Sequence, residues 1–292
     1  MKDKQALRFK RIYIEISNKC NLNCHFCSPI TKPIRTMTAE EFLYIAGQLK
    51  GFTEHLYLHI KGEPLLHPQF REILNICEQF GFMVNITTNG TLLEKQNSIL
   101  LQNSAVRQVN ISVHSFDEQP ETYRKNYLDK IAGFGKAAKE QGRPYISYRM
   151  WNGAKGEMID IKSLDHLCKI AEIISPQTEL PTVMPKRRSA KLAENVFVSW
   201  EEEFVWPSLS HNIYSDKGHC LGAKTMIGIL CDGTVVPCCL DSDGSVPLGN
   251  IFTQPFSEIV LSARLQKMAD NFANGIVSEE LCRRCSYRAR FD

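Results

Sequence analysis

The chain carries at residues 12–27 the run IYIEISNKCNLNCHFC, in which a short apolar strand leads into three closely spaced cysteines. Cys20, Cys24 and Cys27 follow the spacing C-x3-C-x2-C. A cube of four irons normally binds four cysteine thiolates. Three thiolates on one loop therefore leave one iron open, and an open iron can hold a small molecule through an amine and a carboxylate.

A structural zinc site is the alternative interpretation of this loop. Structural zinc prefers cysteine pairs at C-x2-C or similar spacing and a fourth Cys or His ligand. His25 lies inside the triad, but it stands between Cys24 and Phe26 and is poorly placed as a fourth ligand. The spacing therefore favours an iron–sulfur cluster over zinc.

The strand and its cysteine loop resemble the start of the radical S-adenosylmethionine (radical SAM) enzymes. In that family the open iron binds the methionyl end of S-adenosylmethionine (SAM), and an electron from the cluster cleaves SAM to a 5′-deoxyadenosyl radical. The resemblance implies that Cys20, Cys24 and Cys27 bind a [4Fe–4S] cluster and that Phe26 lies near the adenine. It also implies a reductant such as flavodoxin or ferredoxin.

The composition is that of an ordinary globular protein, with 43% hydrophobic and 23% charged residues among 292. A net charge of +3 is too small to indicate nucleic acid by itself. The charged start and the lack of an 18-residue apolar run predict neither a signal peptide nor a membrane span. Eleven cysteines in such a chain are typical of metal or cluster ligands, so we expect a cytoplasmic protein.

Strand and helix patterns alternate from residue 10 to about residue 184. Strands are expected at 12–16, 55–60, 83–87, 109–114, 145–150 and, more weakly, 179–184. Helices are expected at 39–49, 69–80, 127–141 and 164–174. Thr38 with Glu41 predicts a capping box, and Gly81 and Gly142 predict two helix ends.

Such repeats imply a parallel sheet and an α/β fold class. The family resemblance implies an open, partial (β/α)6 TIM-like barrel over residues 1–184, with its chemistry at the carboxyl ends of the strands. Residues 185–219 lack a clean period and are interpreted as a linker that packs on the barrel. Residues 220–292 are expected to form a small cluster-binding domain with a β-hairpin and a helix.

A four-residue motif, Lys61-Gly62-Glu63-Pro64, follows the second expected strand and resembles the family's G-G-E-P, with Lys61 in place of the first glycine. The resemblance implies that Gly62 lets the backbone approach the cofactor. It also implies that Glu63 accepts a hydrogen bond from the ammonium of SAM. From the residues alone, Gly-Glu-Pro would serve equally as a strand-to-helix turn.

Polar residues end the third, fourth and fifth strands. The resemblance makes Thr88, Asn89 and Ser112 candidates for the ribose and carboxylate of SAM, with turn capping as the alternative. His114 falls on the same face as Ser112. Arg149 is a candidate to bind the SAM carboxylate, or to hold or deprotonate the substrate. The alternative is that it forms a salt bridge with an acidic residue at the rim of the barrel. Arg149 and His114 are the candidate catalytic bases.

A second cysteine set lies in the C-terminal part. A hairpin is predicted around Asp232-Gly233, and a helix is predicted at 256–272. Four thiolates converging from three segments would make a closed site, namely Cys220, Cys238, Cys282 and Cys285. Zinc is the alternative metal for such a set.

The C-x(n)-G-x4-C spacing, the following Leu-Gly-Asn-Ile and the final C-x2-C resemble the SPASM/twitch domains of radical SAM enzymes. The cysteine count favours the shorter twitch form with one auxiliary [4Fe–4S] cluster. Cys239 is the alternative to Cys238 as the ligand. Because side chains alternate along a strand, Cys239 is expected to point to the opposite face from Cys238.

The resemblance implies a radical SAM oxidoreductase acting on a small molecule or a peptide, with the auxiliary cluster as electron acceptor. The cofactor carries the difficult step, and the protein orients the substrate and excludes water. Enzymes of molybdopterin-precursor synthesis share the barrel, but their second cluster uses three cysteines and they end in a glycine-rich tail. The alternatives are an RNA-modifying radical SAM enzyme, suggested by the basic tail at 283–290, and a non-catalytic iron–sulfur or zinc redox sensor.

Overall fold

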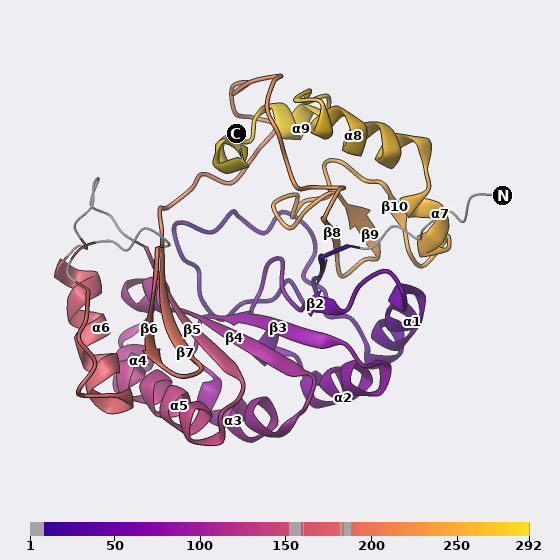
Figure 1. The fold of residues 1–292 in the computed structure, drawn as a ribbon. Coiled ribbons are helices and arrows are strands. Elements are labelled where there is room, and N and C mark those ends of the chain that lie inside the picture. The colour runs from indigo at the N-terminus through magenta and orange to yellow at the C-terminus, as the bar shows by residue number, and fades with distance from the viewer. Residues whose placement is uncertain (1–8, 152–158, 160, 182, 184–187, 292) are drawn as a thin grey trace.

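A ten-stranded sheet in the order β10-β9-β8-β1-β2-β3-β4-β5-β7-β6 organises the molecule (Figure 1). The computed structural model describes residues 9–151, 159, 161–181, 183 and 188–291. The strands are β1 Arg11–Ile14, β2 His55–Tyr57, β3 Met83–Thr88, β4 Val106–Ser112, β5 Tyr145–Trp151, β6 Ser189–Ala193, β7 Val196–Glu201, β8 Met226–Ile229, β9 Thr234–Val236 and β10 Gly249–Asn250.

Helices cover the outer face of the central strands (Figure 1). Their bounds are α1 Ala39–Leu49, α2 Phe70–Phe80, α3 Leu93–Gln102, α4 Glu121–Arg124, α5 Tyr127–Gln141, α6 Ile161–Ile174, α7 Phe256–Val260, α8 Ala263–Ala273 and α9 Glu280–Arg283. The described residues also form the short 3-10 helices η1 Pro64–Leu66, η2 Val113–Glu118 and η3 Ser286–Phe291. None of the helices in the described part of the chain combines the length and the apolar character that a membrane crossing needs.

All neighbouring strands from β8 through β1, β2, β3, β4 and β5 to β7 are parallel, as the strand–helix alternation predicts. Antiparallel strands extend both ends of the sheet, so the sheet stays open. Alternation turns Ile12 and Ile14 of β1 into the core between sheet and helices, where both are fully buried. Tyr13 between them joins a smaller cluster on the inner face of the sheet.

The predicted helix ends are confirmed where a cap sets them. Thr38 and Glu41 form the reciprocal capping box at the start of α1. Gly81 and Gly142 end α2 and α5 in the left-handed conformation, with φ of 74° and 71°. Glycine adopts these angles without the steric cost of a Cβ, and this stops the helix at a defined residue.

The sixth strand of the barrel lies elsewhere than predicted. The described residues of 179–184 form no strand, and β7 is the parallel neighbour of β5 instead. Val196, Val198 and Trp200 of β7 alternate with partly exposed residues and are buried. The interpretation of residues 185–219 as a linker is therefore wrong for its first part, because β6 and β7 complete the sheet.

The C-terminal hairpin is confirmed, and it joins the same sheet. β8 and β9 pair antiparallel across a turn at Gly233, whose φ is 83°. β8 also pairs parallel with β1. The predicted helix at 256–272 is interrupted, because Ser262 leaves the helical conformation and caps the start of α8 through the amide of Leu265.

Candidate active site

The cysteine loop after β1 packs directly on the turn after β2. The amide of Glu63 donates to the Lys19 carbonyl at 2.9 Å. Gly62 has a φ of 77°, and a Cβ there would lie 2.3 Å from the Ser17 carbonyl oxygen. Gly62 thus permits a close approach of the backbone to the cysteine loop, and its predicted approach to the cofactor stays a prediction.

The three N-terminal thiols lie together. Cys24 is buried, Cys20 is half-buried and Cys27 is exposed. The Cys24 thiol hydrogen-bonds to Cys27, and this contact, with burial, raises the pKa of Cys24 well above its usual range. Burial also raises the pKa of Cys20. A set of three neighbouring sulfurs, one of them open to solvent, fits a cluster held at three irons.

His25 does not complete a fourth position in this loop. Its Nδ1 lies 3.0 Å from the Glu118 carboxylate, and its side chain is 69% exposed. The imidazole is therefore paired with a carboxylate and largely open to solvent, which agrees with the sequence argument that it is poorly placed as a fourth ligand.

Glu63 is the centre of a buried hydrogen-bond network. Its carboxylate accepts from Leu65 N at 3.0 Å, from Thr88 Oγ1 at 2.7 Å and from Asn89 N at 2.7 Å. Burial raises the pKa of Glu63 to about 7, against the lowering effect of these donors. A carboxylate has about four acceptor positions, so one stays available for the predicted ammonium contact.

Asn89 connects this network to the cysteine loop. Its side-chain amide donates to Asn21 Oδ1 at 2.9 Å and approaches Cys20 Sγ at 3.9 Å. The Tyr127 hydroxyl donates to the Asn89 carbonyl at 2.8 Å. Thr88 and Asn89 therefore support Glu63 and Cys20, and their predicted contacts with SAM stay predictions. Sequence reasoning missed Asn21, which has no motif of its own.

An aromatic group closes around Phe26. Its ring centroid lies 5.2 Å from that of His114 and 4.3 Å from that of Trp151, while His114 and Trp151 stack at 4.2 Å. The Trp206 indole donates to the Phe26 carbonyl at 3.1 Å. The two predicted residues, Phe26 and His114, are thus brought together, and two tryptophans from distant segments join them.

The environment of His114 disfavours its predicted role as a base. Burial and then the charge of Arg149 lower the pKa of His114 to about 3. Its Nδ1 lies 3.2 Å from the Arg149 carbonyl. An imidazole with so low a pKa is neutral at pH 7 and binds a proton weakly.

Arg149 lies on β5 opposite Ser112 of β4. Its guanidinium pairs with Glu201 of β7 at 3.4 Å, and Arg290 approaches the same carboxylate at 3.6 Å. This is the rim salt bridge that the sequence left as the alternative. A guanidinium stays protonated in proteins, so Arg149 is suited to holding an anion and unsuited to deprotonating a substrate. The Ser112 carbonyl accepts from the Ser115 hydroxyl at 2.7 Å.

His59, which the sequence interpretation did not select, has an unused polar atom near the end of β2. Its Nδ1 is buried and has no hydrogen-bond partner among the described residues. The rings of Tyr13 and Tyr57 meet it at 5.6 and 6.1 Å. Burial and the charge of Arg149 lower the pKa of His59 to about 3. A buried acceptor of this kind is suited to a substrate hydroxyl or amide.

The four C-terminal thiols form one group. Cys238 lies within electrostatic reach of Cys220 and Cys282, and Cys285 lies within reach of Cys220. Burial raises the pKa of the thiols of Cys238, Cys282 and Cys285. Four soft sulfur donors in one group fit a cluster that the protein ligates completely.

Two further observations bear on this set. Cys239 faces the Tyr13 hydroxyl on the inner side of the sheet, away from Cys220 and Cys282. Among the described residues, no three His, Cys, Asp or Glu side chains converge tightly enough to hold a single metal ion.

The basic tail is used inside the protein. Arg288 is buried and donates to the carbonyls of Cys282 at 3.2 Å, Ser215 at 2.7 Å and Lys217. Arg284 pairs with Glu280 at 3.1 Å. These arginines hold the segment around the cysteine pair, so the tail lends no support to the RNA alternative.

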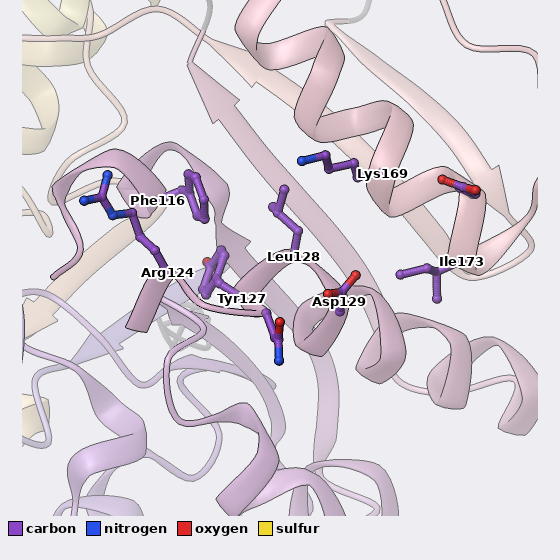
Figure 2. Close-up of a pocket in the computed structure, with 9 residues that line it drawn as sticks. Phe116, Arg124, Tyr127, Leu128, Asp129, Lys169 and Ile173 are labelled. Carbon is purple, nitrogen blue, oxygen red and sulfur yellow. The ribbon is translucent and has the colours of Figure 1, made fainter. Parts of the chain in front are cut away.

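A pocket of about 460 Å³ lies in the outer helical layer between η2, α4, α5 and α6 (Figure 2). Figure 2 shows Tyr127, Leu128 and Asp129 of α5 on one side and Lys169 and Ile173 of α6 on the other. None of the residues that line it is a predicted site residue. Tyr127 connects it to the site, through its hydrogen bond to Asn89.

Comparison with known families gives this arrangement its context. Residues 14–166 match the Radical SAM superfamily. The chain belongs to the radical SAM superfamily. Residues 220–286 match the SPASM iron-sulfur cluster-binding domain. This radical SAM protein therefore uses a SAM-binding [4Fe–4S] cluster, SAM itself and an auxiliary cluster, as the sequence predicted.

Curated relatives include enzymes of one named activity. A GTP 3′,8-cyclase of Synechocystis sp. is 27% identical over 147 residues, which is 48% of this chain and 45% of the relative. A probable GTP 3′,8-cyclase of Methanococcus maripaludis is 26% identical over 282 residues, which is 86% of this chain and 92% of the relative.

Solved structures share the fold at low identity. BtrN in complex with AdoMet and 2-DOIA has a TM-score of 0.56 and 16% identity, covering 95% of this chain and 93% of BtrN. Streptococcus suis SuiB bound to the precursor peptide SuiA has a TM-score of 0.61 and 15% identity, covering 96% of this chain and 71% of SuiB. These likenesses support the predicted α/β fold with an open, partial TIM-like barrel.

Proposed function

We propose that this radical SAM enzyme is an oxidoreductase that removes a hydrogen atom from a small polar molecule or a peptide and passes an electron from the substrate to the auxiliary cluster. The observation that carries the proposal is the group of four C-terminal thiols, Cys220, Cys238, Cys282 and Cys285. Four thiolates on one cube leave no iron open for a substrate, so such a cluster is suited to electron transfer.

Each part of the chain has a distinct task in this proposal. When bound, the SAM cluster and SAM supply a 5′-deoxyadenosyl radical, and the auxiliary cluster supplies a site that accepts an electron. Cys20, Cys24 and Cys27 hold the first cluster. Glu63 and Asn89 keep the cysteine loop on the sheet, through the contacts to Lys19 and Cys20. Phe26 with its aromatic neighbours excludes water from the same side.

The position of Cys239 supports electron transfer toward the inner face of the sheet. Cys238 faces the other cysteine ligands, and the next residue faces Tyr13 on β1. The auxiliary cluster is thereby connected to the barrel wall through one peptide unit. His59 and Arg149 lie on the same inner side and are the residues that we propose for holding a polar, partly anionic substrate.

GTP cyclisation is the second candidate function, because a probable GTP 3′,8-cyclase aligns over 92% of its length. The fourth C-terminal thiol speaks against it, since a cluster held by four thiolates has no open iron to bind GTP. Anaerobic incubation with GTP, SAM and dithionite distinguishes the two. We expect no consumption of GTP beyond that of a Cys20→Ala control, and a cyclised GTP product would replace the oxidation proposal.

The auxiliary cluster is tested by metal analysis of the Cys20/Cys24/Cys27→Ala variant after anaerobic reconstitution. We expect about four irons and four sulfides per chain, held by the remaining cysteines. Zinc, or no metal, in a folded variant would remove the electron acceptor and with it the oxidation proposal. A Cys168→Ala variant is the matched control, because Cys168 is exposed on α6 and belongs to neither group.

Radical generation is tested separately, by release of 5′-deoxyadenosine from SAM in the reduced enzyme. We expect release by the full-length protein and by a Cys282→Ala variant, and none by the Cys20→Ala variant. If Cys282→Ala lost as much 5′-deoxyadenosine release as Cys20→Ala, the assignment of radical generation to the first cluster alone would be contradicted. No release from a protein with both clusters loaded would leave a redox sensor as the better description.

A further inference from the structure

Lys61 stands where the family motif has its first glycine, and its side chain reaches the C-terminal domain. Its ammonium donates to the Pro29 carbonyl and lies 3.2 Å from the Asp243 carboxylate. Only 8% of the Lys61 side chain is exposed, whereas 41% of the Asp243 side chain is exposed. An ammonium taken out of water needs partners of this kind.

The loop 28–32, which follows Cys27, is attached to the same domain at further points. Thr31 Oγ1 donates to the Asp243 carboxylate at 2.7 Å. Lys32 pairs with Asp232 of the hairpin turn at 2.8 Å. The Lys61 ammonium lies between these two parts of the chain. It therefore fixes the loop of the SAM-binding cluster relative to the domain of the auxiliary cluster.

The position of this charge has an electrostatic consequence. The Lys61 ammonium lies against the carbonyl of Pro29, two residues after the cluster ligand Cys27. Water screens a nearly buried charge poorly, so its effect on a neighbouring group is larger than at the surface. Reduction adds a negative charge to a cluster, and a nearby positive charge stabilises the reduced state. Asp243 offsets part of this effect because it carries the opposite charge.

We propose that Lys61 is a positioning residue that ties the cysteine loop to the auxiliary-cluster domain and raises the reduction potential of the SAM-binding cluster, with Asp243 as its partial counter-charge. Local charge and hydrogen bonding are known controls of cluster potential. The inference concerns only the SAM-binding cluster, so it stands whether the overall reaction is an oxidation or a cyclisation.

The test is a potentiometric titration of the full-length, anaerobically reconstituted protein, followed by electron paramagnetic resonance. The signal that changes on addition of SAM belongs to the SAM-binding cluster. At a fixed potential we expect Lys61→Met to lower its reduced-to-oxidised ratio by about tenfold, which is about 59 mV for one electron. We expect Asp243→Asn to raise the ratio, and Lys61→Arg to stay within about threefold of the native protein.

Opposite shifts separate the electrostatic role from a purely structural one. A structural role predicts that Lys61→Met and Asp243→Asn disturb the cluster in the same direction, and that result would overturn the proposal. Thr31→Val is the control, because it removes a hydrogen bond to Asp243 without changing any charge; its ratio is expected to be unchanged. If Lys61→Met binds no iron, the Asp243→Asn variant tests the proposal instead. An unchanged or lowered reduced-to-oxidised ratio in Asp243→Asn would reject it.

Discussion

Gly62 is the residue at which the cysteine loop depends most directly on the absence of a side chain. A Cβ there would meet the carbonyl oxygen of Ser17 at 2.3 Å, and its φ of 77° is unfavourable for other residues. We expect Gly62→Ala to destabilise the protein by about 2 kcal/mol or more and to lower its iron content. Denaturant unfolding and iron analysis measure both effects.

Gly47→Ala is the matched control for this prediction. Gly47 lies in α1, and a Cβ there would meet nothing within 4 Å. Alanine in a helix interior is favoured over glycine by about 1 kcal/mol, so this variant is expected to be slightly stabilised. Equal losses of stability in the two variants would contradict the steric explanation for Gly62.

His67 is a buried imidazole that makes the stability of the protein depend on pH. Its Nδ1 accepts from Gln69 N at 3.0 Å, and its Nε2 lies 2.7 Å from the Met37 carbonyl. Burial lowers the pKa of His67. A lowered pKa means that the folded state binds the proton less well than the unfolded state. The stabilising contribution of His67 is therefore present above about pH 6.5 and is lost as the pH falls.

His67→Gln tests this sign. We expect the variant to be less stable than the native protein by about 1–3 kcal/mol at pH 8, because two buried hydrogen bonds are lost. The difference should shrink at pH 5, where the native protein has lost part of its advantage. Urea unfolding at the two pH values gives both differences, with the exposed His211→Gln as control. A difference that widens toward pH 5 would refute the argument.

At the scale of elements, the start of α1 rests on a reciprocal cap. Thr38 Oγ1 accepts from Glu41 N at 3.1 Å, and Glu41 accepts from Thr38 N at 2.8 Å. We expect Thr38→Ala to lower the free energy of unfolding by about 1 kcal/mol. Thr38→Ser keeps the hydroxyl and should lose less than half of that. Chemical unfolding that ranks the serine variant with the alanine variant would show that the cap is unimportant here.

Elements bounded by local signals were predictable, and elements bounded by tertiary contacts were not. The capping box of α1 and the glycines after α2 and α5 act within a few residues, so their sequence pattern is enough. β6 has a single buried residue, Leu192, and takes its place by pairing with β7. The alternation of β7 was detectable, but only the sheet shows that it replaces 179–184 as the sixth strand.

In the candidate site, too, residues in local motifs were predictable and residues brought together by tertiary contacts were not. The cysteine spacings and the Gly62-Glu63 pair predicted where the two thiol groups form, because these motifs are local. Trp151 and Trp206 reach Phe26 from more than 100 residues away, and Arg149 finds Glu201 across the sheet. Such partners depend on which strands become neighbours, and one chain's pattern does not specify that.

At the scale of the whole molecule, the C-terminal domain is structurally continuous with the barrel. β8 pairs with β1 over Arg11–Ile14, and the amide of Glu15 continues the pairing to the Ile229 carbonyl at 2.9 Å. The amide and thiol of Cys231 both contact the Glu15 carboxylate, at 3.3 and 3.0 Å. β1 would become an exposed edge strand without β8, and unpaired edges are prone to aggregation.

We therefore expect the barrel and the auxiliary-cluster domain to unfold together. Native-state hydrogen exchange is the measurement, because it reports an opening free energy for each segment. Amides of β1 and β8 should open with the same free energy, close to that of global unfolding, whereas those of the exposed segment 209–211 should open far more easily. If β8 and β9 open well before β1, the hairpin is a separate unit. In that case the loop after Cys27 moves relative to the second cluster, and the Lys61–Asp243 contact becomes the main restraint between them.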